Sequence, residues 1–180
     1  MVTTATMSRA DRAVATVWEA LAAIPDPEIP VVSVVELGIV RGVDWRGDEL
    51  VVTVTPTYSG CPATELIAAD IERVLAASGV GRYRVERRLA PAWTTDWIAP
   101  EARERLARFG IAPPGTRAAP AGVQMIDTSA IRTRRAAARI ACPRCGSSNT
   151  REISRFGSTP CKAQYRCEDC LEPFDYFKPH

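Results

Sequence analysis

Apolar residues recur along the chain with two different periods, and these periods predict its secondary structure. Over residues 8–24 they fall three and four positions apart, which predicts a helix with one apolar face. The same spacing returns over residues 63–77, between Pro62 and Gly79, and predicts a second helix. Residues 100–109 form a shorter, more charged segment that begins with proline and predicts a third helix.

Runs of β-branched and alternating residues predict strands at 39–45, 50–55 and 83–89. The turn sequence Arg-Gly-Asp-Glu separates the first two strands, which is typical of a hairpin. The order is helix, strand, strand, helix, strand, helix. We therefore expect an α+β fold, with a small sheet of three or four strands packed with helices.

The composition changes near residue 110 and again near residue 140. Residues 1–110 hold the predicted α+β domain. Residues 111–139 are rich in Pro, Ala and Arg, which predicts a linker with one Arg-rich helix around Ser129–Arg139. Residues 140–180 contain five of the six cysteines and form the third region.

Two features of the whole chain exclude several function classes. The sequence has neither an apolar run of membrane-spanning length nor a secretory signal pattern, so we expect a cytoplasmic protein. The single histidine is His180, the last residue. This excludes an internal histidine base, and also a diiron site built from Glu-x-x-His pairs. We expect an accessory protein without turnover of its own.

Two Cys-x-x-Cys pairs, Cys142 with Cys145 and Cys167 with Cys170, dominate the third region. Each pair places two thiolates on one side of a tight turn, and two facing pairs can surround a zinc ion tetrahedrally. The sequence between and after the pairs predicts short strands, so the layout is that of a zinc ribbon. A reducing compartment disfavours disulfides. The spacing itself does not separate zinc from an iron–sulfur cluster on the same sulfurs.

The remaining candidate side chains allow more than one interpretation. Cys161 either replaces one of the four ligands or, as we expect, is a small buried residue. Cys61 precedes a helix start, where the helix dipole favours a thiolate, but an inert buried cysteine fits equally well. Asp26 and Glu28 lie in a stiff proline-rich loop, where they could orient a metal or simply be solvated.

Three segments carry a resemblance: IPDPEIPVVSVVELGIV, VTVTPTYSGCPATE and APAWTTDWI. With them, the N-terminal domain resembles the family of small iron–sulfur maturation domains that includes SufT and eukaryotic cluster-targeting proteins. The resemblance implies that Cys61 is a cluster-associated thiol and that Asp26 and Glu28 form the family's acidic loop. It also implies a transient iron–sulfur cluster as cargo, beside a structural zinc ion in the ribbon.

The ribbon segments GSTPCKAQYRC and FDYFK extend the resemblance. The whole chain is similar to accessory subunits of phenylacetyl-CoA epoxidase systems, the ring-epoxidising multicomponent oxygenases of aerobic phenylacetate degradation. This implies a role in assembling or repairing a metal centre, either an iron–sulfur cluster or a diiron site. The implied partners are the oxygenase and reductase subunits. Because one cysteine cannot hold a cluster alone, a homodimer or a client protein must supply the other ligands.

Three other functions remain open from the residues alone. The chain could be a general iron–sulfur carrier with other client proteins, or a scaffold that docks through its ribbon. It could also bind nucleic acid through the ribbon and the arginines of the predicted linker. A net charge of only +2 disfavours nucleic acid.

Overall fold

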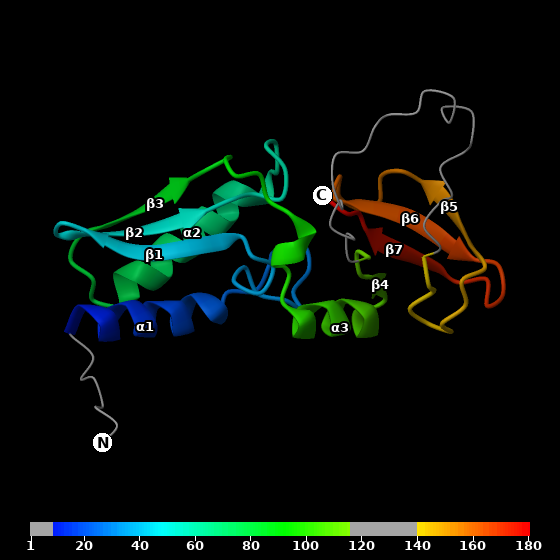
Figure 1. Ribbon diagram of the computed structural model, residues 1–180, viewed down its shortest axis with the longest axis horizontal. Coiled ribbons are helices and arrows are strands. Elements are labelled where there is room, and N and C mark those ends of the chain that lie inside the picture. The colour runs from blue at the N-terminus through cyan, green and yellow to red at the C-terminus, as the bar shows by residue number, and fades with distance from the viewer. Residues whose placement is uncertain (1–8, 116–139) are drawn as a thin grey trace, which may run out of the picture. The chain divides into compact units, whose positions relative to one another are not determined.

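The computed structural model describes residues 9–115 and 140–180, which fall into two compact units (Figure 1). The first unit runs to Arg105 and includes His180, and the second comprises Leu106–Pro179. The helix expected around Ser129–Arg139 lies outside the described residues. No helix in the described ranges is long and apolar enough to cross a membrane.

Three α-helices form where the apolar spacing predicts them. They are α1 (Arg9–Ala22), α2 (Ala63–Ala77) and α3 (Pro100–Phe109). The bounds of α2 and α3 match the prediction. By contrast, α1 ends two residues before the predicted end, because Pro25 and Pro27 supply no N–H groups to continue its hydrogen bonds.

The first unit contains one sheet of three strands, in the order β1-β2-β3. Its strands are β1 (Val40–Arg46), β2 (Glu49–Val54) and β3 (Tyr83–Arg87). The hairpin makes β1 and β2 antiparallel, whereas the crossover through α2 makes β3 parallel to β2. Figure 1 shows α2 behind this sheet, and α1 packs on α2 and β1.

The core of the first unit lies between the sheet and its helices. Leu50 and Val52 of β2 are fully buried, as are Ile71 and Leu75 of α2. Because strand side chains alternate between faces, the residues paired with these positions turn charged groups to the opposite face. The sheet therefore has one apolar face and one open, charged face.

The segment before β1 is fixed by a reciprocal pair of hydrogen bonds. The backbone N–H of Ser33 donates to Glu36 Oε2 at 2.9 Å, and the N–H of Glu36 donates to Ser33 Oγ at 3.2 Å. The turn then closes at Gly38, which has a φ of +70°. Trp93 Nε1 donates to the carbonyl of Leu37 at 2.9 Å, which anchors this turn to the segment after β3.

The second unit is a four-stranded sheet in the order β4-β7-β6-β5. Its strands are β4 (Ile111–Ala112), β5 (Thr150–Ser154), β6 (Lys162–Cys167) and β7 (Pro173–Phe177). Two residues from the start of the predicted linker, Ile111 and Ala112, form β4 and pair in parallel with β7. Both are buried, which explains why they join the sheet rather than remaining in a solvated loop.

The α+β fold class with a separate ribbon is confirmed, and one glycine tests how tightly the first unit is packed. A Cβ at Gly38 would lie 2.6 Å from Trp97 Cβ and 2.9 Å from the Trp97 carbonyl oxygen. At Gly47, which has a φ of +67°, a Cβ would meet nothing within 4 Å. We predict that Gly47→Ala lowers the free energy of unfolding by about 1 kcal/mol, the cost of left-handed backbone alone. We predict a further loss of about 2 kcal/mol for Gly38→Ala.

Urea denaturation followed by tryptophan fluorescence measures this difference, because Trp18, Trp45, Trp93 and Trp97 are the only tryptophans and all lie in the first unit. Equal losses for the two variants would contradict the tight contact between Gly38 and Trp97.

Candidate metal centre

Four cysteine sulfurs of the second unit gather in one place. The Sγ atoms of Cys142, Cys145, Cys167 and Cys170 all lie within 4.8 Å of one another. The Cys142–Cys170 pair is separated by 3.8 Å and the Cys145–Cys167 pair by 3.5 Å. A tetrahedral site with metal–sulfur bonds of about 2.3 Å has edges of about 3.8 Å. The four thiols therefore fit one tetrahedral metal ion, as the sequence predicts.

Backbone geometry aims the first pair of sulfurs at the centre. The N–H of Cys142 donates to the Ser147 carbonyl at 2.8 Å, and the N–H of Gly146 donates to the Cys142 carbonyl at 2.9 Å. Gly146 has a φ of +76°, which closes the turn. The N–H of Arg144 also lies 3.4 Å from Cys142 Sγ, where it would stabilise a thiolate.

The second pair is held in a similar turn at the end of β6. The N–H of Cys167 donates to the Glu172 carbonyl at 3.0 Å, and Leu171 has a φ of +64°. Asp169 lies between the two cysteines and accepts hydrogen bonds from Ser147 Oγ and, at 2.7 Å, from Asn149 Nδ2. These bonds hold the pKa of Asp169 below its ordinary value and tie the second turn to the first. The sequence pattern gives no sign of this bridge.

The protein environment separates the proton affinities of the thiols. Hydrogen bonding from the backbone N–H of Cys170 lowers the pKa of Cys167 to about 7. The Ser147 backbone acts in the same direction on Cys145, but contact with the Cys167 sulfur and desolvation raise the pKa of Cys145 to about 12. One thiolate therefore forms readily, and a dication would displace the protons of the others.

Cys161 is not one of the four. Its side chain is buried, with an exposed fraction of 4%, and its sulfur lies 3.0 Å from Thr159 Oγ1. The expectation that Cys161 is a small buried residue is confirmed.

Cys61 lies in the first unit, at the turn that leads into α2. Its N–H donates to the Tyr58 carbonyl at 3.2 Å, and its own carbonyl accepts from the N–H of Thr64 at 3.2 Å. Pro62 is the N-cap residue of the helix, with a φ of −67°, and no side chain caps this end. The thiol is partly exposed, at the helix start where the sequence places it.

The two carboxylates of the proline-rich loop differ in environment. Asp26 is buried, and its Oδ1 accepts the N–H groups of Glu28 at 2.9 Å and Ile29 at 2.8 Å. The N–H of Asp26 donates to the Val32 carbonyl at 2.9 Å, which closes the loop. Asp26 is thus an internal acceptor of the loop, a role that an Asp-Pro turn sequence can indicate. Glu28 is partly buried.

Cys61, Asp26 and Glu28 do not form a second metal cluster of the same kind. Among residues 9–115 and 140–180, the four ribbon cysteines are the only group of three or more potential ligands close enough to share an ion. The functional roles of Cys61, Asp26 and Glu28 therefore stay predictions.

Comparison with known families gives a separate match for each of the two cysteine-bearing regions. Residues 14–86 match the family described as "Iron-sulfur cluster assembly protein", and residues 127–178 match the "PaaD zinc beta ribbon domain". Cys61 falls in the first match and the four clustered cysteines in the second.

Individual proteins resemble the chain over different lengths. An Escherichia coli protein, named as a putative D-type component of 1,2-phenylacetyl-CoA epoxidase, is 47% identical over 162 residues, which is 90% of each chain. A Porphyromonas gingivalis protein named "Fe-S protein maturation auxiliary factor" is 37% identical over 84 residues, covering 46% of this chain and 79% of its own. A solved Bacillus anthracis domain of unknown function is 28% identical, covers 53% of this chain and 92% of its own, and has a TM-score of 0.49.

The first of these relatives matches nearly the full length of both chains, across the assembly region and the ribbon. The chain therefore belongs to the PaaD family of 1,2-phenylacetyl-CoA epoxidase components, and it combines an iron–sulfur cluster assembly domain with a zinc β-ribbon.

Proposed function

We propose that this chain assembles or repairs a metal centre of a phenylacetyl-CoA epoxidase system and that Cys61 handles the iron or the cluster. The observation that carries the proposal is the division of the thiols. Four are gathered in the ribbon and Cys161 is buried, whereas Cys61 is partly exposed at a helix start within the assembly-type region. The relatives named for the epoxidase and for Fe–S maturation support the same role.

The ribbon cysteines would hold a structural zinc ion. All four positions of a tetrahedron are filled by protein sulfurs, which is typical of structural rather than catalytic zinc. A bound zinc ion would cross-link the two turns and stabilise a sheet that has a small core of its own. This assignment favours zinc over an iron–sulfur cluster because the region matches a zinc ribbon family.

Cys61 suits temporary binding because the chain gives it no partner thiol in its own unit. The other five cysteines all lie between residues 142 and 170. A cluster at Cys61 would therefore take its other ligands from a second copy of the chain or from the client protein. Incomplete ligation by the carrier lets the client's cysteines displace it and receive the iron.

The two loop carboxylates would assist in different ways. Asp26 fixes the backbone of its loop through the two hydrogen bonds it accepts. Glu28 would provide a carboxylate for iron or for a client's basic side chain. The clients we propose are the oxygenase and reductase subunits of the epoxidase system, and the chain itself performs no turnover.

We predict that the protein as isolated contains about one zinc ion per chain and that Cys142→Ser abolishes zinc binding. Removing one of four ligands forfeits most of a binding free energy of about 10–16 kcal/mol, so the second unit unfolds. Metal analysis by mass spectrometry measures the zinc, and backbone amide exchange of β5–β7 reports the unfolding. Cys161→Ala is the matched control and keeps its zinc. Full zinc content in Cys142→Ser would refute the assignment.

We also predict that anaerobic reconstitution with iron and sulfide loads the wild-type chain and Cys161→Ala, but not Cys61→Ala. The reason is that Cys61 supplies the only thiolate outside the ribbon region. Iron content and the visible absorption of the cluster measure the loading. If Cys61→Ala takes up the same iron with the same spectrum, the thiol has no part in iron handling.

A further inference from the structure

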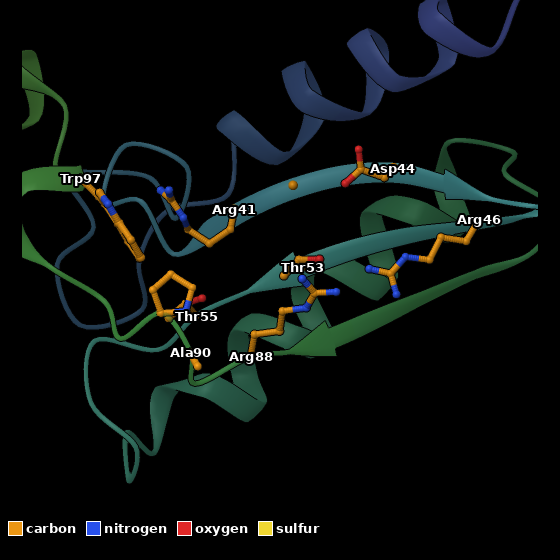
Figure 2. Close-up of a pocket in the computed structure, with 10 residues that line it drawn as sticks. Arg41, Asp44, Arg46, Thr53, Thr55, Arg88, Ala90 and Trp97 are labelled. Carbon is orange, nitrogen blue, oxygen red and sulfur yellow. The ribbon is translucent and has the colours of Figure 1, made fainter.

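The open face of the first sheet carries a row of arginines that the proposed iron chemistry does not use. Strand pairing places Gly42, Thr53 and Glu86 side by side across the three strands. At the end of this row is a pocket of about 250 Å³, drawn in Figure 2. Arg41 and Trp97 lie at one end of the pocket, and Arg88 lies opposite.

Arg41 is held in place without an acidic partner. Its guanidinium carbon lies 3.6 Å from the centre of the Trp97 ring, so the flat cation stacks on the indole. This contact occupies one face of the guanidinium and leaves the N–H groups at its edge directed outward. Arg41 makes no ion pair with any carboxylate in the described part of the chain. A fixed cation with unused donors is a favourable anion contact.

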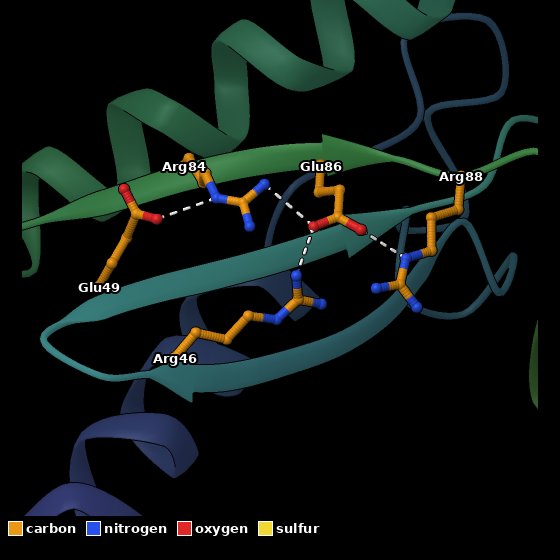
Figure 3. A network of polar contacts seen from close by, with 5 residues as sticks. All are labelled: Arg46, Glu49, Arg84, Glu86 and Arg88. Carbon is orange, nitrogen blue, oxygen red and sulfur yellow. Dashed lines mark hydrogen bonds and ion pairs between the residues drawn. The ribbon is translucent and has the colours of Figure 1, made fainter.

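The opposite wall is organised by a single carboxylate, shown in Figure 3. Glu86 contacts Arg88 at 2.5 Å, Arg46 at 2.7 Å and Arg84 at 3.0 Å. Hydrogen bonding from Arg88, helped by Arg46, lowers the pKa of Glu86 to about 2, so it is charged at neutral pH. Because Arg88 uses its Nε for Glu86, its two terminal nitrogens are not needed for that bond.

The pocket keeps a positive balance when its acids are counted. Asp44 also lines it, and Glu86 contacts two of its arginines. Three guanidinium groups, those of Arg41, Arg46 and Arg88, against these two carboxylates leave one net positive charge.

The floor of the pocket adds neutral donors. Thr53 and Thr55 lie along β2 and just after it, and both line the pocket. A threonine hydroxyl can donate a hydrogen bond to an anion. The donors therefore surround the pocket from three directions: β1, β2 and the segment after β3.

We propose that this pocket binds the phosphate group of a phosphorylated small molecule. A planar carboxylate is fully served by one guanidinium fork, whereas a tetrahedral phosphate uses donors that converge from several sides. The guanidinium edges of Arg41 and Arg88 contact its oxygens, and the hydroxyls of Thr53 and Thr55 complete the site. This proposal stands independently of the role of Cys61.

Titration calorimetry of the full chain with pyrophosphate, in a phosphate-free buffer at low ionic strength, tests the site. We expect wild-type protein to bind one pyrophosphate, and Arg41→Gln to weaken binding about tenfold, the loss expected for one charge-assisted contact. Arg88→Gln gives a second test from the opposite wall. The matched control is Arg73→Gln. Arg73 pairs with Asp70 at 2.7 Å on α2, which covers the other face of the sheet, so this variant binds as the wild type does.

Two outcomes would overturn the proposal. One is no binding by the wild type, or equal weakening by Arg41→Gln and Arg73→Gln. The other is tighter binding of a hexaglutamate peptide than of pyrophosphate, which would assign the pocket to an acidic protein segment. Thermal unfolding without ligand checks that each variant is folded, and Arg41→Lys, which keeps the charge but loses the planar stack, is expected to bind with intermediate affinity.

Discussion

The close approach of four thiols in the ribbon is the constraint on which the rest of the molecule's chemistry depends. Two turns, each closed by a residue with positive φ, Gly146 and Leu171, direct their sulfurs to one point. Four neighbouring thiols gain little from weak S–H contacts, but as thiolates around a dication they cross-link both ends of the sheet. Once these sulfurs are committed to structure, Cys61 is the one partly exposed thiol left for exchange with a partner.

The first unit couples its own features through Trp97. On one side the tryptophan packs so closely on Gly38 that the turn before β1 admits no side chain. On another side its ring supports Arg41. The same indole therefore fixes the backbone that starts β1 and the cation at the end of the sheet. The charged face and the apolar face of this sheet are thus positioned by one frame, although they serve different purposes.

Sequence reasoning succeeds where the signal is local and periodic. Apolar spacing with a flanking Pro62 and Gly79 predicts the bounds of α2, and paired cysteines predict the four-sulfur site. It does not find β4, because the two-residue strand has no period and depends on pairing with β7. It leaves Asp26 as a candidate metal group, since only the folded loop shows two N–H groups bound to its carboxylate. The stack of Arg41 on Trp97 joins residues distant in sequence and has no sequence signal.

X-ray absorption at the zinc edge, on protein isolated without added metal, tests the division of the thiols most directly. Four sulfur neighbours at about 2.3 Å, unchanged in Cys61→Ala, are the predicted result. A shell with fewer than four sulfurs, or one that changes when Cys61 is removed, would show that Cys61 and the ribbon thiols serve one site and would contradict their separation.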